Sequence, residues 1–518
     1  MTPIVYTDYY KTEHFRMYPE HTTLIYSNLT PRKSRLEGVN SIVVFGVQHF
    51  IKKYLLGKFK ENFFDVPWEQ VDAEYKYAIN IDTEHIRQLH QLGYLPLCIQ
   101  ALPEGMRCPI RVPCVVIWNT LSEFYWLTNY LETLMSCQLW QPMTSATIAA
   151  EYWKVLSKYA EETSDEKDFV QWQGHDFSMR GMSSLESAIL SGMAHLTSFT
   201  GTDTIPAIYA LRDSYGSKGL IGASVPATEH SVMCMGTLED EIGTFSRLLD
   251  LYPTGILSIV SDTWSLPNVI TKILPALKDK IMARDGKLVI RPDSFWTDPV
   301  DCMCGYDGVH KQMFGMTEEE KQSIREGVIE ALWNIFGGTV NSKGFKQLDH
   351  HIGAIYGDSI TLERATEICK RLKKKGFAST NLVYGIGSYT YQMNTRDTFG
   401  FAMKATYGEI VQMPPHRADG QVSYQEFKNL KNETREIYKD PVTDDGTKKS
   451  AKGLLYVGMG RDGIYLRDQA SWEDVHDPNN LLQVVFRDGE LVKEWTLDEI
   501  RERIKNPHNE MIAVDIHE

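Results

Sequence analysis

The chain has 518 residues, of which 42% are hydrophobic and 24% are charged. At about 150 residues per domain this length predicts two to four domains, and the composition excludes a disordered or fibrous protein. The 68 acidic residues outnumber the 54 basic ones and give a net charge of −14. That charge argues against nucleic-acid and anionic-membrane partners, while a locally basic pocket for a phosphorylated small molecule stays compatible with it.

The N-terminal segment does not have the pattern of a secretory peptide. Residues 1–16 carry acidic and basic side chains where such a peptide needs an apolar stretch, and no run reaches the eighteen apolar residues of a membrane span. Eight cysteines are scattered without a CxxC pair, and no HExxH motif is present, which argues against a disulfide framework and a structural zinc site. We therefore expect a cytoplasmic protein with reduced thiols.

Three parts of the chain differ in pattern. Residues 1–165 show mixed strand patterns and a Trp- and Tyr-rich helix expected over 118–139, and residues 411–518 are charged and end in strand and helix patterns. Residues 166–410 hold the most regular series of short apolar runs. We expect an α/β protein in which a (β/α) barrel over 166–410 is flanked by a second α/β domain built from both termini.

Four apolar runs, 255–260, 287–290, 352–356 and 381–384, are the clearest predicted strands of the barrel, and each closes on Asp, Gly, Ser or Arg. Between the runs, Ser183 with Glu186 and Thr317 with Glu320 have the spacing of helix capping boxes. Over 316–336 apolar side chains recur every three or four residues, which predicts a helix with one face on the barrel.

Charged side chains collect where the predicted strands end. In a parallel barrel these carboxyl ends form the active face. Two arginines and several carboxylates there suit a phosphorylated substrate with Mg²⁺, because guanidinium groups bind phosphate and carboxylates hold the metal. The alternative is that these charges only pair with one another. The residues concerned are Arg180, Asp203, His230, Asp262, Arg291, Asp293 and Asp358.

Two glycine-bearing turns add a possible anion site. Gly357-Asp358 follows one strand and Gly385-Ile386-Gly387-Ser388 follows the next. Exposed N–H groups at such turns bind anions. Neither turn is a P-loop or a dinucleotide fingerprint, and alone both are weak signals.

A series of motifs runs in order along most of the chain. It comprises Asp8-Tyr9-Tyr10-Lys11, Trp126-Leu127-Thr128-Asn129, His175-Asp176-Phe177 with Arg180-Gly181, Gly201-Thr202-Asp203-Thr204, Ser224-Val225-Pro226-Ala227 with Glu229-His230-Ser231, Ser258, Val260-Ser261-Asp262, Ile290-Arg291-Pro292-Asp293-Ser294, Gly357-Asp358, Thr395-Arg396-Asp397 and Lys439-Asp440-Pro441-Val442. Together these motifs resemble the nicotinamide phosphoribosyltransferase family, type II phosphoribosyltransferases of nicotinamide salvage.

The resemblance implies an irregular (β/α) barrel of the type II phosphoribosyltransferases and a reaction that joins nicotinamide to phosphoribosyl pyrophosphate. The products would be nicotinamide mononucleotide and pyrophosphate. It also implies Mg²⁺, ATP as a co-substrate whose phosphoryl group passes to His230, and a homodimer with shared active sites. The residue types agree, because an oxocarbenium-like transition state needs a positioned base and a neutralised leaving group.

The family's functional residues carry over by position. The pyridine ring would lie between Phe177 and Tyr10 of the neighbouring subunit, with Asp203 facing the carboxamide. A carboxylate accepts from an amide but repels a carboxylate, so Asp203 favours nicotinamide over nicotinic acid. The resemblance also makes His230, Asp262 and Asp293 catalytic, with Asp262 and Asp293 as metal or ribose organisers.

The other implied residues bind substrate. They are Arg180 and Arg291 for pyrophosphate, Gly357 and Asp358 for ribose, Gly387, Ser388 and Arg396 for the product phosphate, Asp8, Ser224 and Ser258 elsewhere in the substrate site, and Arg32, Lys404, Lys439 and Lys448 along a phosphate channel.

Three departures from the family pattern and two alternatives remain. Phe295-Trp296 stands where a Gly is usual, Ser388 replaces a second Gly, and Ala223 replaces an aromatic residue. The alternative enzyme is a nicotinate phosphoribosyltransferase, which should lack an acidic residue facing the base. A catalytically silent barrel would lose the charges at the strand ends, which this chain keeps.

Overall fold

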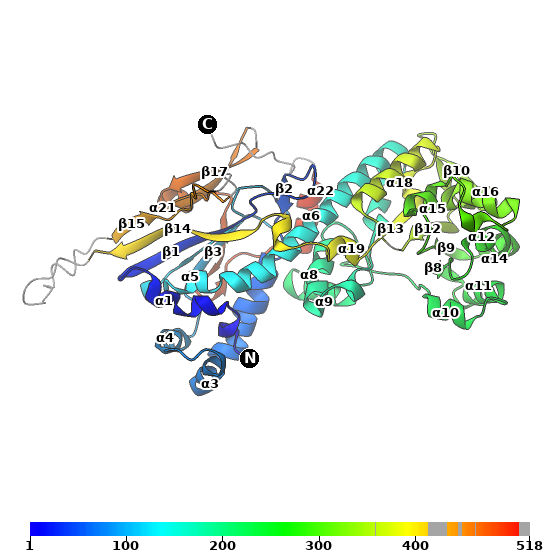
Figure 1. Cartoon of the computed structure of the whole chain (residues 1–518). Coiled ribbons are helices and arrows are strands. Elements are labelled where there is room, and N and C mark those ends of the chain that lie inside the picture. Colours follow the sequence, from blue (N-terminus) through cyan, green and yellow to red (C-terminus); the bar gives the residue numbers. More distant parts are fainter. Residues whose placement is uncertain (358, 413–431, 444–447, 462, 507–518) are drawn as a thin grey trace, which may run out of the picture. The chain divides into compact units, whose positions relative to one another are not determined.

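The computed structural model describes residues 1–357, 359–412, 432–443, 448–461 and 463–506 (Figure 1). The chain forms two compact units. Unit 1 comprises Met1–Thr147, Ala210–Lys218 and Asn394–Glu518, and unit 2 comprises Ile148–Tyr209 and Gly219–Met393. The domain limits expected at 165/166 and 410/411 stay a prediction.

Unit 2 is built on a six-stranded parallel sheet in the order β7-β6-β13-β12-β9-β8. The four predicted runs are strands, which confirms that part of the expectation. The bounds are β6 Gly174–Asp176, β7 Gly201–Thr202, β8 Thr254–Val260, β9 Asp285–Arg291, β12 Ile352–Tyr356 and β13 Leu382–Ile386.

The two outer strands of this sheet are joined by one further segment. Ala223 bridges in parallel to Gly201 of β7, and Ala227 bridges in parallel to Ser258 of β8. The backbone bonds agree, with Thr202 N donating to Ala223 O at 3.0 Å and Ser258 N donating to Pro226 O at 2.9 Å. Residues 223–227 therefore curl the sheet into the predicted α/β barrel.

Helices lie outside the parallel strands, as Figure 1 shows for α15, α16 and α18. Two helices, α6 and α9, run from one unit into the other. The bounds are α6 Glu132–Thr163, α7 Val170–Gln173, α8 Leu185–His195, α9 Ile205–Ser214, α10 His230–Met235, α11 Glu241–Leu251, α12 Leu266–Asn268, α13 Leu274–Ala276, α14 Lys278–Met282, α15 Pro299–Cys304, α16 Glu318–Glu326, α17 Val328–Phe336, α18 Leu362–Lys374 and α19 Ser388–Tyr391.

Two helix expectations need correction. The capping box at Thr317 and Glu320 is present, but α8 is capped by Ser184, whose side chain accepts from Ser187 N, and not by Ser183. The single helix expected over 316–336 is two helices. Gly327 separates them with φ of +78°, and a Cβ there would lie 2.3 Å from Gly305 N. This close approach and the left-handed backbone break the helix.

Unit 1 contains a seven-stranded antiparallel sheet in the order β15-β14-β1-β5-β3-β18-β19. The N-terminal strands β1, β5 and β3 form its centre and C-terminal strands flank them on both sides, which confirms a second α/β region built from both termini. The bounds are β1 Thr22–Thr30, β3 Leu97–Ala101, β5 Val115–Asn119, β14 Ala402–Val411, β15 Asn432–Glu436, β18 Gln483–Arg487 and β19 Glu490–Leu491.

Two small antiparallel pairs and several helices complete unit 1. The pairs are β2 Ser41–Val43 with β4 Arg107–Pro109 and β16 Leu454–Gly460 with β17 Gly463–Ala470, and the helices are α1 His14–Met17, α2 Val47–Phe50, α3 Trp68–Ala78, α4 Glu84–Leu92, α5 Leu127–Tyr130, α21 Trp472–Val475 and α22 Leu497–Lys505. The helix expected over 118–139 is wrong at its start. Trp118 lies in β5, because the β-branched run before it favours a strand buried between β1 and β3.

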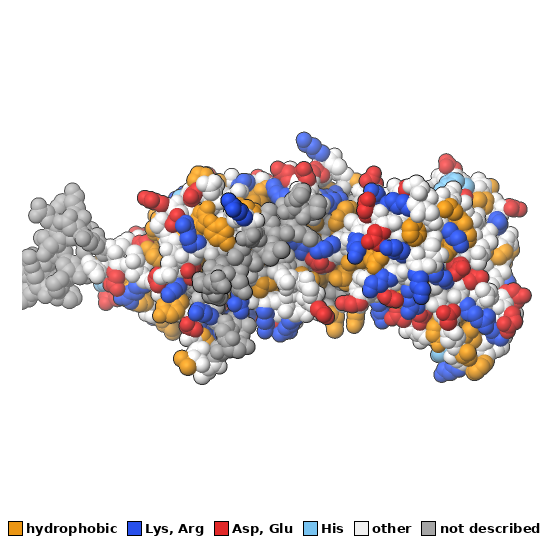
Figure 2. Space-filling view, turned by 90° about the horizontal axis from the view of Figure 1, so that it is seen from above, with side chains coloured by type: hydrophobic (Ala, Val, Ile, Leu, Met, Phe, Trp, Pro, Cys, Tyr) orange, Lys and Arg blue, Asp and Glu red, His pale blue; other side chains and the backbone are white. Residues whose placement is uncertain are grey.

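The surface carries charges of both signs. Acidic and basic side chains are intermixed over the face shown in Figure 2. Within the described part of the chain, no helix combines the length and the apolar character needed to cross a membrane.

Candidate active site

A pocket of about 700 Å³ opens in unit 2 at the carboxyl ends of the parallel strands. This volume is in the usual range for a small-molecule site. Apolar side chains, among them Met182, Leu185 and Ala188, line one part of it. Six residues predicted from the sequence line it as well, and they are Phe177, Arg180, Asp203, Arg291, Asp293 and Gly357.

Arg291 is held by contacts on several sides. It ends β9, its Nη2 donates to Thr228 O at 2.5 Å, and its Nε lies 3.7 Å from Asp293 Oδ1. Its guanidinium carbon is 6.0 Å from the centre of the Phe177 ring. A guanidinium fixed in this way presents its remaining N–H groups to an anion without losing side-chain freedom on binding.

Gly357 lies against Asp293 at the end of β12. A Cβ at this position would lie 2.0 Å from Asp293 Oδ1. The strand end therefore needs glycine, and any side chain here would displace the carboxylate. Asp358, predicted beside it, lies outside the described residues.

Asp262 faces His230 across the strand ends. Its side chain is 5% exposed, and Oδ2 accepts from Asp293 N at 2.9 Å and from Ser294 Oγ at 2.6 Å. Oδ1 lies 3.4 Å from His230 Nε2 and accepts no hydrogen bond from the described residues. A buried carboxylate oxygen without a donor is a costly arrangement unless a cation or a protonated imidazole meets it.

This arrangement fits a magnesium ion. Mg²⁺ prefers carboxylate oxygens and usually keeps most of its other contacts for water and phosphate. Asp262 Oδ1, and Asp293 beside it, supply hard oxygen ligands next to the arginine that would meet the phosphates. The residues present are therefore suited to the ion that the sequence resemblance implied.

Asp203 also lines the pocket and comes directly after β7. Its Oδ1 accepts from His175 Nε2 at 3.0 Å and from Ser224 Oγ at 2.5 Å. Partial burial raises the pKa of the Asp203 carboxyl, but the hydrogen bonds from His175 and Ser224 and the charge of Arg291 outweigh burial and lower it. Asp203 therefore stays ionised at neutral pH.

Ser258 lies within β8, and the Gly387 turn follows β13. Ser258 is 4% exposed, and its Oγ has no hydrogen-bond partner among the described residues. Gly387 precedes α19, whose first residue is Ser388. A Cβ at Gly181 would lie 2.0 Å from Ser388 Oγ, so the side chain that replaces a family glycine is accommodated by a second glycine.

The predicted residues of unit 1 form a separate, basic group. Burial lowers the pKa of Lys404, and the charges of Arg32, Lys11 and Lys439 lower it further against the opposing effect of Glu132. Arg32 is tied to this region by its Nε, which donates to Gly400 O at 3.0 Å. A group of cations around Lys404 is suited to phosphate.

Other predicted residues of unit 1 are near the N-terminus or exposed. Asp8 Oδ2 accepts from Thr133 Oγ1 at 2.7 Å, and the Tyr10 ring is 61% exposed. The Arg396 and Lys448 side chains are exposed, with Arg396 Nη2 lying 3.9 Å from Asp397. The Tyr10 ring meets His14 edge-on within the same chain and keeps most of its surface exposed.

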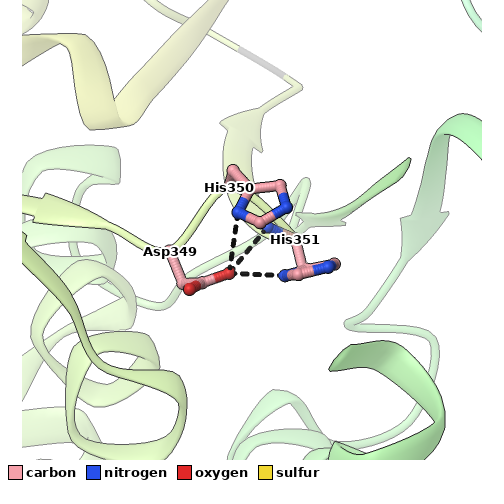
Figure 3. A group of neighbouring side chains, drawn as sticks. All are labelled: Asp349, His350 and His351. Atoms are coloured by element: carbon pink, nitrogen blue, oxygen red, sulfur yellow. Dashed lines mark hydrogen bonds and ion pairs between the residues drawn. The ribbon is translucent and has the colours of Figure 1, made fainter. Parts of the chain in front are cut away.

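A histidine cluster lies at the other end of the barrel. Asp349, His350 and His351 form the turn before β12, with potential ligand atoms within 4.8 Å of one another (Figure 3). Asp349 Oδ1 accepts from His351 N at 3.0 Å and lies 2.7 Å from His351 Nδ1. An aspartate that binds the N–H two residues on stabilises a turn. We assign this group a structural role at the amino end of β12.

Three residues that hold predicted site residues in place were not themselves predicted, namely His175, Thr228 and Ser294. Each lies within or beside one of the sequence motifs from which other site residues were predicted. Their roles depend on hydrogen bonds across strands, for which the sequence carries no signal.

Comparison with known proteins agrees with this geometry. Residues 172–414 match the nicotinate phosphoribosyltransferase (NAPRTase) family, and residues 3–66 match the N-terminal domain of nicotinamide phosphoribosyltransferase. Human nicotinic acid phosphoribosyltransferase has a TM-score of 0.56 at 14% identity, with 97% of this chain and 95% of that one covered. Nicotinate-nucleotide pyrophosphorylase from Pyrococcus furiosus has a TM-score of 0.52 at 14% identity, covering 96% and 93%. The fold is that of the type II phosphoribosyltransferases.

Relatives in sequence identify the family within this fold class. A nicotinamide phosphoribosyltransferase from Acinetobacter baylyi is 46% identical, with 97% of each chain covered. Proteins of the same description from Mycoplasma pneumoniae, 37% identical over 77% of this chain and 88% of that one, and Xanthomonas campestris, 30% identical over 96% of each, also match. The chain belongs to the nicotinamide phosphoribosyltransferase family.

Proposed function

We propose that this protein transfers the phosphoribosyl group of phosphoribosyl pyrophosphate to nicotinamide, giving nicotinamide mononucleotide and pyrophosphate in NAD salvage. Its family membership supports this reaction, and the contact that carries the choice of base is Asp203 in the pocket, held ionised beside Phe177 and Arg291. An ionised carboxylate accepts from the amide of nicotinamide and repels nicotinate, which would bring a second negative charge.

The base would stack on Phe177, which lines the pocket together with Asp203 and Arg291. The exposed Tyr10 would cover the other face from a second copy of the chain. A flat ring between two aromatic side chains gains area burial and stacking at once. This arrangement makes the active enzyme a homodimer in which each site uses both subunits. Arg32, Lys404, Lys439 and Lys448 would guide phosphate.

The leaving group would be neutralised by Arg180 and Arg291. Charge develops on pyrophosphate as its bond to the ribosyl carbon lengthens, and preorganised donors stabilise that charge more than they stabilise the bound substrate. Asp262 and Asp293 would hold Mg²⁺, which supplies charge neutralisation to the phosphate oxygens when it is bound. Gly357 keeps Asp293 in place for this task.

ATP would act through His230. Asp262 faces Nε2 of this imidazole, which leaves Nδ1 to attack the terminal phosphorus of ATP. The new N–P bond forms as the P–O bond to ADP breaks, and ADP leaves. Water later cleaves the phosphohistidine and releases phosphate. The added negative charge would recruit the metal and prepare the site for the donor.

A cytoplasmic location completes the proposal. All eight cysteines are free thiols, six of them buried, as is usual for proteins of a reducing compartment.

A direct assay tests the reaction. The purified protein is incubated with phosphoribosyl pyrophosphate, Mg²⁺ and either nicotinamide or nicotinic acid, with and without ATP, and the mononucleotides are quantified by liquid chromatography. We expect nicotinamide mononucleotide as the main product and a higher yield with ATP. Preferential use of nicotinic acid would identify a nicotinate phosphoribosyltransferase, and no mononucleotide from either base would overturn the proposal.

A further inference from the structure

His175 lies behind the residue that faces the base. It belongs to β6 and pairs with Gly201 of β7, so that Asp203 follows two residues later on the neighbouring strand. Its Nε2 is 3.0 Å from Asp203 Oδ1, its side chain is 12% exposed, and it is absent from the pocket lining to which Asp203 contributes. His175 can therefore affect a ligand in the pocket through the two pocket residues it contacts, Asp203 by a hydrogen bond and Phe177 by ring packing.

The imidazole is fixed by its surroundings. A Cβ at Gly201 would lie 2.7 Å from His175 Nδ1, so the ring rests directly on the glycine backbone. Its centroid is 4.5 Å from that of Phe177. Packing on both sides leaves the ring little freedom, and the hydrogen bond to Asp203 has a defined direction.

The two oxygens of Asp203 have different surroundings. Oδ1 accepts from His175 and from Ser224, whereas Oδ2 accepts no hydrogen bond from the described residues. The Asp203 side chain is 45% exposed and lines the pocket. Two donors on Oδ1 thus turn the other oxygen toward the space that a base would fill.

We propose that His175 is a positioning residue that sets the preference for nicotinamide over nicotinic acid by directing Asp203 Oδ2 into the pocket. A donor on Oδ1 stabilises the charged carboxylate and prevents its rotation. Without that donor the carboxylate would turn or accept a proton, and its repulsion of a second carboxylate would weaken. This inference rests on the proposed function, since it concerns the choice between the two bases.

Two substitutions at one position separate the hydrogen bond from the packing. His175→Gln keeps an N–H donor near the position of Nε2, whereas His175→Leu keeps volume and removes the donor. His351→Leu is the matched control, because His351 is similarly buried and also pairs with an aspartate, Asp349, at the far end of the barrel (Figure 3). The measured quantity is the ratio of kcat/KM for nicotinamide to kcat/KM for nicotinic acid.

We expect His175→Leu to lower this ratio about fivefold, His175→Gln to stay within about twofold of wild type, and His351→Leu to leave the ratio unchanged. The KM for phosphoribosyl pyrophosphate should stay within about twofold in all three. In an Asp203→Asn background, His175→Leu should have no further effect on the ratio.

An unchanged ratio in His175→Leu, or an equal fall in the Gln and Leu variants, would overturn the inference. A wild-type enzyme that prefers nicotinic acid would instead overturn the proposed function. Should His175→Leu fail to fold by circular dichroism, His175→Ala with the same rescue by Gln decides the question.

Discussion

The two sheets of this protein distribute chemistry in different ways. In the parallel sheet of unit 2 all strands end at the same edge, so Asp203, Arg291 and Gly357, which are far apart in sequence, meet around one pocket. In the antiparallel sheet of unit 1 successive strands end at opposite edges, and the basic group gathers around Lys404 within a strand. We therefore expect substitutions in the barrel of unit 2 to alter the chemical step and the choice of base. Substitutions in the basic group of unit 1 should alter substrate binding.

The largest effect is expected from Arg291→Ala. Removal of the guanidinium leaves the leaving pyrophosphate without its fixed donor, and kcat/KM for mononucleotide synthesis should fall about a thousandfold, with ATP hydrolysis lost as well. Arg371→Ala in the same unit, where Arg371 pairs with Asp301 on the helical layer, is the control and should keep activity. Activity retained in Arg291→Ala would break the assignment of chemistry to unit 2.

Complementation tests whether each active site combines Tyr10 of one subunit with Asp203 of the other. Tyr10→Ala and Asp203→Ala should each lower activity about a hundredfold in isolation. Mixing the two after reversible dissociation should restore about a quarter of wild-type activity, because half of the dimers are mixed and each has one intact site. No recovery, or a fully active monomer by light scattering, would contradict shared sites.

His230→Ala should separate ATP coupling from transfer. We expect loss of ATP hydrolysis and of the stimulation by ATP, while slow mononucleotide synthesis persists at about a tenth of the stimulated rate. Radiolabelled γ-phosphate should appear as an acid-labile adduct on the wild-type chain only. If the variant responds to ATP as the wild type does, His230 is a pyrophosphate ligand.

Asp203→Ser should depress the use of nicotinamide and relatively improve the use of nicotinic acid. Loss of the negative charge removes both the acceptor for the carboxamide and the repulsion of nicotinic acid, so the ratio of kcat/KM values should fall about tenfold or more. Parallel assays with the two bases measure this ratio. The charge-based explanation fails if the ratio does not change.

The smallest effect is expected from Lys404→Gln in unit 1. Removing one of several cations should raise the KM for phosphoribosyl pyrophosphate about threefold with little change in kcat, and the effect should shrink at high salt. The lowered pKa of Lys404 means that its charge is lost at a lower pH than that of an ordinary lysine, so the wild-type KM should rise with pH before ordinary lysines lose their charge. A large loss of kcat would contradict the assignment of binding to unit 1 and of chemistry to unit 2.

Local sequence patterns were sufficient to predict many of the strands and helix caps of the barrel. Residues 352–356 form β12 with the predicted limits, and Thr317 with Glu320 forms the predicted cap, because strand propensity and capping depend on residues close in sequence. The order of motifs along the chain was sufficient to identify the family and to predict six residues that line the pocket. Functional residue types recur at the same points of the chain, and the parallel topology brings those points together.

Tertiary structure alone decided how these residues are held. The bonds from His175 to Asp203 and from Ser294 to Asp262 cross between strands, and Gly327 breaks a helix because the backbone of Gly305 packs against it. Residues 223–227 close the barrel through two isolated bridges, and no apolar run in the sequence predicts a strand there. Each of these features depends on the distance between residues remote in sequence, and such distances are determined only when the sheet has formed.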